Sequence, residues 1–70
     1  MIETEFLLTY KQRDILRLAA DGATNAEISE MLHIAPDTVK HHWKVIKRGL
    51  HARNKTHAVV LAMREGYINL

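Results

Sequence analysis

Basic side chains gather in one part of this 70-residue chain, and they indicate the chemistry to look for first. From residue 38 to residue 64 there are seven lysines and arginines and no aspartate or glutamate. They are Lys40, Lys44, Lys47, Arg48, Arg53, Lys55 and Arg64. Residues 1–37 have the opposite balance, so the net charge of +2 hides an acidic half followed by a basic half. A one-sided group of bases is suited to the phosphates of a nucleic acid.

Residues for other chemistries are not arranged to support them. The five histidines include no pair at positions i and i+4, and the chain has no cysteine, so we expect no metal site. Ser29 is the only serine, and no histidine and aspartate can be placed beside it. We therefore expect neither a cofactor nor enzymatic activity.

The length and composition limit how these bases can be positioned. Seventy residues with 47% hydrophobic content make one small domain with a single core. Without cysteines, helix packing or a partner chain must supply the stability that disulfides would otherwise give. No apolar run approaches the roughly 20 residues of a membrane span, and the acidic N-terminus is unlike a signal peptide. A cytoplasmic protein is the expectation.

Two helices are predicted before the basic half, each from the spacing of a capping box. Thr9 with Gln12 starts the first helix, which Asp21 and Gly22 end. Its apolar face is predicted to contain Leu8, Ile15, Leu18 and Ala19. Thr24 with Glu27 starts a second, short helix that ends near His33. Its apolar stripe is predicted to contain Ile28, Met31 and Leu32.

A third helix is predicted over residues 36–50, after a tight turn at His33-Ile34-Ala35 in which Ile34 points inward. Pro36 suits the first turn of this helix and keeps Ala35 extended. One side of the helix is apolar, with Val39, Trp43, Ile46 and Leu50. The other side carries Lys40, His41, Lys44, Lys47 and Arg48. Taken alone, this could be an ordinary solvated face; a short helix and tight turn before it favour a helix-turn-helix whose second helix enters the major groove.

The last helix is predicted to run from an Asn54 cap to about Glu65, with Gly66 just past its end. Ala58, Leu61 and Ala62 lie on one side of the helical wheel. Thr56, Val59, Val60 and Met63 lie on nearly the opposite side. A helix that is apolar on both sides needs two partners, the core and, in our interpretation, the same helix of a second protomer. The alternatives are an exposed patch or contact with another domain.

The chain resembles the LuxR-type, or GerE-like, DNA-binding domain of bacterial transcription regulators from Leu8 to Ile68. The matching positions are Leu8-Thr9, Gly22, Asn25-x-Glu27-Ile28, Leu32, Ile34, Thr38-Val39-Lys40-x-His42, Leu50, Arg53-Asn54-x-Thr56-x-Ala58-Val59 and Gly66. The resemblance implies an all-α, four-helix helix-turn-helix fold. The domain would cover residues 8–70, after a short N-terminal extension of residues 1–7.

The resemblance also implies roles for individual residues. Those expected to face base edges in the major groove are Lys40, His41 and Lys44. Those expected to hold phosphates are Thr24, Asn25, Thr38, Lys47, Arg48, Arg53, Asn54 and Lys55. Glu27 is expected to brace the start of its helix rather than touch DNA. For His42, phosphate contact and a local packing role remain equal alternatives.

Four positions depart from the family pattern. Tyr10 replaces a frequent proline, Ala35 a capping serine, Trp43 a smaller aliphatic residue and Gly49 a frequent lysine. Loss of the serine cap costs about 1 kcal/mol, partly offset by Pro36 and Asp37. The larger ring of Trp43 requires a rearranged core beneath the third helix.

The sequence hypothesis is therefore a sequence-specific, homodimeric transcription regulator bound to a pseudo-palindromic duplex operator in the bacterial cytoplasm, associated with the nucleoid. RNA polymerase and other regulators are further candidate partners. Because only residues 1–7 precede the domain, no sensing domain or small-molecule ligand is expected within the chain, unless it is an excised domain. The rival hypothesis is an anti-activator that pairs with full-length relatives through its last helix. An RNA-binding role is disfavoured by the lack of exposed aromatic residues for stacking.

Overall fold

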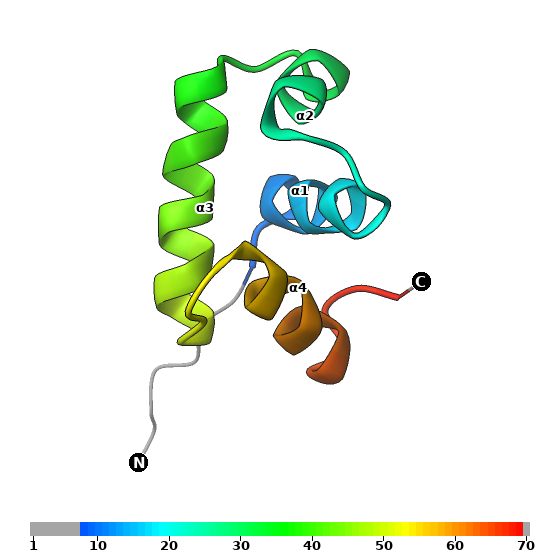
Figure 1. Ribbon diagram of the computed structural model, residues 1–70, viewed down its shortest axis with the longest axis vertical. Helices are drawn as coiled ribbons and strands as arrows, with labels where there is room; N and C mark the ends of the chain where they lie inside the picture. The colour runs from blue at the N-terminus through cyan, green and yellow to red at the C-terminus, as the bar shows by residue number, and fades with distance from the viewer. Residues whose placement is uncertain (1–7, 70) are drawn as a thin grey trace.

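The computed structural model describes residues 8–69, which form four helices and no strand. The helices are α1 (Tyr10–Ala20), α2 (Asn25–Leu32), α3 (Pro36–Leu50) and α4 (Lys55–Arg64). Helix α3 runs along the long axis of the molecule, and α2, α1 and α4 are arranged in that order along one side of it (Figure 1). The all-α fold predicted from the sequence is confirmed. The predicted extension, residues 1–7, and residue 70 lie outside the described residues.

Helix α1 begins at the predicted capping box. The Gln12 backbone N–H donates to Thr9 Oγ1 at 3.1 Å, and the Thr9 N–H donates to Gln12 Oε1 at 3.1 Å. Ile15 and Leu16 are fully buried, whereas Leu18 is only partly so. The predicted apolar face does face the core, with Leu18 and Ala19 packed at its margin, but the prediction missed Leu16, which is buried because α1 packs on three other helices.

Helix α2 has the second predicted capping box, with Thr24 N–H donating to Glu27 Oε1 at 2.8 Å and Glu27 N–H to Thr24 Oγ1 at 3.2 Å. It ends at His33 in the left-handed conformation, with φ of 57°. Ile28 is buried, but Met31 is 59% exposed, so its predicted place in the apolar stripe was wrong. The buried side of this short helix is instead formed by Ile28 and Ser29, and Met31 lies at the edge of that side, facing solvent.

Helix α3 has the predicted bounds. Ala35 makes no side-chain cap and Pro36 occupies the first turn, as the sequence indicated. Val39, Trp43 and Ile46 are buried beneath it, in the core shared by all four helices. The other core residues are Leu8, Ile15, Leu16, Ile28, Ala58, Ala62 and Ile68.

Helix α4 begins where Asn54 Oδ1 accepts the His57 N–H at 2.8 Å. Ala58 and Ala62 are fully buried, and their small side chains let α4 approach α3 and α1 closely. Val59 and Met63 are half-buried and pack against the core. Two of the residues predicted to lie on the outer side of α4 therefore also contact the core.

The chain after α4 turns back onto the core. Gly66 adopts φ of 84°, and Ile68, which the sequence had not marked as core, is 2% exposed. The Arg13 guanidinium lies 5.6 Å from the centre of the Tyr67 ring, which joins this segment to α1. Across residues 8–69, every helix is too short or too polar to cross a membrane.

Candidate nucleic-acid interface

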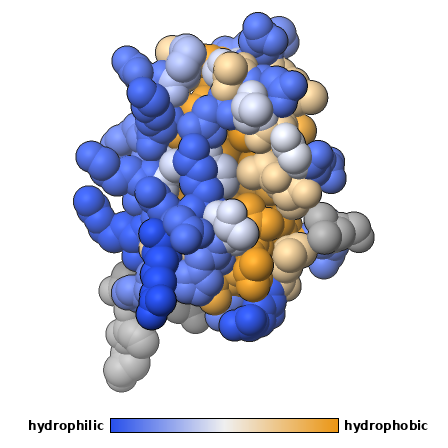
Figure 2. All heavy atoms as spheres, in the orientation of Figure 1, coloured by the Kyte–Doolittle hydropathy of each residue, from blue (hydrophilic) through white to orange (hydrophobic). Residues whose placement is uncertain are grey.

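The outer side of α3 is a continuous basic surface. Lys40, His41 and Lys44 are exposed and, at 100° per residue, fall within a 100° arc of the helix. Arg48 is exposed on the same side, one to two turns later, and Lys47 is half-buried beside it. Figure 2 shows this side of the molecule as hydrophilic, with the apolar surface displaced toward the right. The predicted base-facing residues thus share one accessible face.

A groove of about 370 Å³ brings three of the predicted phosphate contacts together. Thr24 and Asn25 line it from the start of α2, and Lys55 lines it from the start of α4. The remaining lining residues are Ala19, Ala20, Ala23, Trp43, Thr56, Val59 and Val60. The groove is therefore lined by polar side chains from the starts of α2 and α4 and by apolar side chains from α1, α3 and α4.

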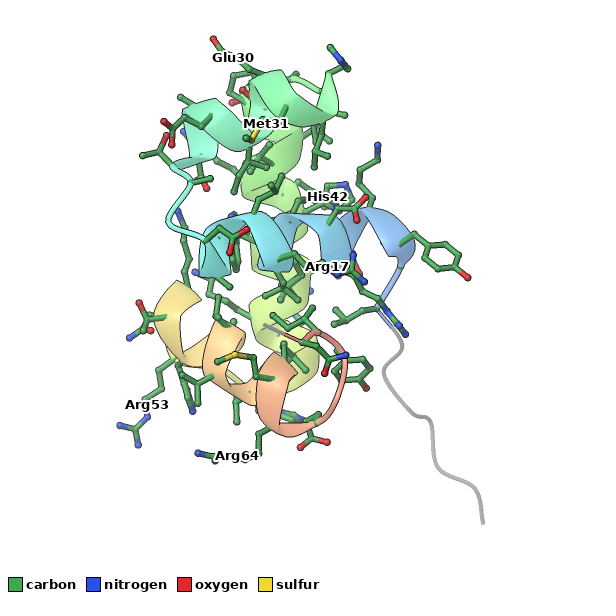
Figure 3. All side chains as sticks on the ribbon, turned by 90° about the vertical axis from the view of Figure 1, so that its right-hand side faces the viewer. Arg17, Glu30, Met31, His42, Arg53 and Arg64 are labelled. Atoms are coloured by element: carbon green, nitrogen blue, oxygen red, sulfur yellow. The ribbon has the colours of Figure 1, made fainter. Side chains whose placement is uncertain are left out.

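The other predicted phosphate contacts lie outside this groove. Thr38 is exposed in the first turn of α3, and Arg53 and Asn54 are exposed immediately before α4. The Arg53 side chain extends away from the body of the molecule (Figure 3). Its backbone N–H is already used, because it donates to His57 Nδ1 at 3.0 Å.

Several predicted phosphate contacts already have partners within the protein. Thr24 uses both its N–H and its hydroxyl in the capping box. Asn25 Oδ1 accepts a hydrogen bond from Trp43 Nε1 at 2.9 Å, and Lys55 Nζ lies 5.7 Å from the centre of the Trp43 ring. Among the described residues, no hydrogen bond is made by the backbone N–H of Asn25 or Ala26. An anion at this end of α2 would therefore meet these two N–H groups and the Asn25 side-chain amide, and beside them the Thr24 hydroxyl, whose oxygen accepts in the capping box but whose proton can still be donated.

Two residues beside the basic surface act within the protein. Glu27 caps α2, as the sequence indicated. His42 is half-buried, and its Nδ1 lies 3.4 Å from Gln12 Nε2 on α1, which favours the packing role over phosphate contact (Figure 3). Burial lowers the pKa of His42 below its ordinary value of 6.5, and the neighbouring His41 and Lys11 lower it further.

The Trp43–Asn25 and His42–Gln12 pairs were not foreseen from the sequence. A buried indole N–H usually has an acceptor, so a partner for Trp43 could have been expected, but its identity depends on how α2 packs on α3. Within residues 8–69, no group of three or more histidine, aspartate or glutamate side chains is placed to hold a metal ion.

Comparison with known proteins assigns this arrangement to a family. The family model described as bacterial regulatory proteins, luxR family, matches residues 7–62. The chain belongs to this family. It is a LuxR-type helix-turn-helix DNA-binding domain of the kind found in transcription regulators. Members of this family are DNA-binding proteins and not enzymes.

Relatives of this LuxR-family chain include longer regulators. The chain is 42% identical over 62 residues to the transcriptional activator protein BjaR1 of Bradyrhizobium diazoefficiens, with 89% of this chain and 26% of the relative covered. It is 36% identical over 66 residues to the HTH-type transcriptional regulator AlkS of Ectopseudomonas oleovorans, with 94% of this chain and 8% of the relative covered. The chain thus corresponds to about a quarter or less of these relatives.

Two solved structures are similar to the whole LuxR-type domain. The structure of the transcription factor GerE gives a TM-score of 0.87 at 26% identity, with 93% of this chain and 97% of the GerE chain covered. The phage VqmA–DPO complex gives a TM-score of 0.79 at 30% identity, with 90% of this chain and 29% of the other covered.

Proposed function

We propose that this domain binds duplex DNA sequence-specifically, with α3 in the major groove and Lys40, His41 and Lys44 facing base edges. The observation that carries the proposal is the exposed basic side of α3, a helix of a helix-turn-helix that has no acid between residue 38 and its end at Leu50. Lysine can donate to the O6 and N7 acceptors of guanine, which lie in that groove.

The phosphate backbone would be held on both sides of α3. At the start of α2 the contacts would be Asn25 and, beside it, Thr24; at the start of α4 they would be Arg53, Asn54 and Lys55. Thr38, Lys47 and Arg48 would supply further contacts from α3 itself. Such contacts fix the register of the protein on the duplex without reading its sequence.

The active form would be a homodimer formed through α4, with Val60 at its centre. Val60 is 37% exposed, and its half-buried neighbours Val59 and Met63, together with the exposed Thr56, complete the outer side of the helix. A stable interface buries about 800 Å² on each partner, which is a large share of the 4860 Å² surface of this chain. The short α4 cannot supply that area alone, so we expect dimerisation mainly on an operator with two half-sites.

Regulation would then act on transcription at the bacterial nucleoid, with RNA polymerase or other regulators as further partners. We propose no small-molecule ligand within this chain.

Selecting bound sequences from a random duplex pool tests the proposal directly. We expect enrichment of a pseudo-palindrome whose half-sites are separated by about one turn of DNA, roughly 10 base pairs. A mobility-shift assay on the selected duplex should then show one dimer per site. A chain that enriches no duplex but co-purifies with a full-length LuxR-type regulator would contradict the proposal and support the anti-activator hypothesis instead.

A further inference from the structure

Trp43, the only tryptophan of the chain, lies on the buried side of α3. It contacts one predicted phosphate contact on α2 and another on α4. The residue is 2% exposed. Its indole N–H donates to Asn25 Oδ1 at 2.9 Å, and its ring lies 5.7 Å from Lys55 Nζ. Asn25 is the first residue of α2 and Lys55 is the first residue of α4, so one side chain contacts the starts of both neighbouring helices.

The hydrogen bond sets the orientation of the Asn25 amide. An indole N–H can only donate, so the amide oxygen must face it, and the amide NH2 group is left to donate elsewhere. Asn25 also lines the groove described above, together with Trp43 and Lys55. The NH2 group is the part of Asn25 that can bind a phosphate oxygen, and Trp43 keeps the competing acceptor away from it.

The ring has a separate effect on Lys55. A lysine ammonium close to an aromatic face is attracted by the negative electrostatic potential of the π-electrons on that face, which restricts an otherwise flexible side chain. A DNA phosphate is a stronger partner for the same ammonium, so binding would draw Lys55 away from the ring. The indole is therefore placed to respond to phosphate binding.

We propose that Trp43 is a positioning residue: it orients the amide of Asn25 at the start of α2 for a phosphate and restrains Lys55 at the start of α4 until a phosphate takes its ammonium, both beside the base-reading side of α3. This inference rests on the DNA-binding function proposed above. A smaller aliphatic side chain at this position would fill part of the core but would supply neither the donor to Asn25 nor the aromatic face to Lys55.

Trp43→Phe separates positioning from core packing, because phenylalanine keeps an aromatic ring and lacks the N–H donor. Affinity for the selected duplex should fall about 3- to 10-fold, the value of one neutral hydrogen bond. The slope of log affinity against log salt should become shallower, by about 0.9 for each phosphate that the variant no longer binds. Ile46→Val is the matched control: it alters a buried residue of the same helix that does not line the groove, and should leave the slope unchanged.

Asn25→Ala tests the same bond from the other side without altering the core residue. It should weaken binding at least as much as Trp43→Phe, and the double variant should be no weaker than Asn25→Ala alone, because the indole donor acts through Asn25. Additive effects in this double-mutant cycle would overturn the inference. So would a Trp43→Phe chain with the affinity and salt slope of the wild type.

Tryptophan emission provides a second readout. Adding duplex DNA should change the emission of the wild-type chain, and Lys55→Met should reduce that change. An emission that saturating duplex leaves unaltered would overturn the inference while leaving the proposed function intact. A wild-type chain that binds no duplex would overturn both.

Discussion

At the scale of single residues, one side of α3 is buried in the core and the other is exposed to solvent. Val39, Trp43 and Ile46 are buried in the core, whereas Lys40 and Lys44 are exposed. Substitutions on the exposed side should therefore affect DNA binding with little effect on folding.

Lys40→Ala and Lys44→Ala should each reduce discrimination at particular base pairs by about 1 to 3 kcal/mol, because a base-edge contact is local. Binding to a set of single-base operator variants measures this reduction, and circular dichroism should show unchanged helicity. Arg64→Ala, an exposed change in the last turn of α4, is the control and should leave discrimination as it is. If both lysine variants keep wild-type specificity, the proposed docking of α3 is wrong.

His42 should make folding stability depend on pH. Its pKa in the folded protein is lowered, first by burial and then by His41 and Lys11, so the unfolded chain takes up a proton at a higher pH than the folded one. Stability should therefore fall as the pH decreases through the ordinary value of 6.5 towards the lower folded pKa. Thermal unfolding between about pH 7.5 and about pH 5 should show a decrease in Tm that is smaller in His42→Gln.

The control for this prediction is His51→Gln, because His51 is an exposed residue at the end of α3. Its pH dependence should match that of the wild type. A wild-type Tm that does not change on acidification would contradict the assignment to His42.

At the scale of helices, local signals in the sequence were sufficient for the number, order and ends of the elements. The capping boxes at Thr9 and Thr24, Pro36 at the first turn of α3 and Asn54 before α4 act within a few residues, so they can be recognised without a tertiary structure. These local hydrogen bonds and backbone restrictions do not depend on how the helices pack.

Packing angles account for what the sequence did not predict. Met31 and Ile28 lie about 60° apart on a two-turn helix, and a small rotation decides which of them is buried. The same uncertainty applies to Val59 and Met63 on α4. The Trp43–Asn25 bond joins residues 18 positions apart, and no periodicity within one helix can locate it. The roles of individual residues in DNA binding stay predictions.

The C-terminal ends of the helices offer a test of backbone strain. His51 has φ of 58°, a left-handed conformation that costs a non-glycine residue about 1 to 2 kcal/mol. His51→Gly should relieve this strain, but glycine also increases the conformational entropy of the unfolded chain, which offsets part of the gain. The free energy of unfolding should therefore rise by about 0.5 to 1 kcal/mol. Urea unfolding measures the change.

Gly66→Ala is the opposite change at a comparable position. Gly66 has φ of 84°, and an added Cβ would meet no atom within 4 Å, so only backbone strain should act. The variant should be less stable by about 1 kcal/mol. Equal stability of both variants and the wild type would show that neither helix end is strained.

The outer side of α4 can be tested by placing a charge on it. Val60→Glu should stay folded and should occupy an operator with two half-sites as a monomer, with reduced affinity but with weak binding to one half-site retained, because an unpaired charge opposes burial in a dimer. Analytical ultracentrifugation and circular dichroism measure assembly and folding. Met31→Glu is the matched control, since Met31 is an exposed apolar residue on α2. A wild type that occupies its operator as a monomer would contradict the dimer.

At the scale of the whole molecule, charge is divided between the helices. The acids lie mainly in and around α1 and α2, while the bases from residue 38 onward lie in α3, α4 and their connection. Duplex DNA would thus meet mainly positive charge from α3 and the start of α4, although Glu27 and Asp37 lie in the first turns of α2 and α3.

Binding should therefore depend strongly on salt. A dimer that neutralises roughly 6 to 10 phosphates should give a log-log slope near −0.9 per phosphate, and Lys47→Ala or Arg53→Ala should make the slope shallower. Arg17→Ala is the control, because Arg17 lies on α1 and pairs with Asp14 at 2.9 Å. A wild-type slope near zero would rule out phosphate contacts as the basis of binding.

The two-sided character of α3 also has an evolutionary consequence. Substitutions at exposed positions usually change stability by less than about 0.5 kcal/mol, whereas changes at buried positions cost much more. Mutations can therefore accumulate at Lys40, His41 and Lys44 while Val39 and Ile46 are held by selection for folding. Under the docking proposed for α3, a gene duplicate of this chain would acquire a new DNA preference through a few substitutions at these positions, without passing through an unfolded intermediate.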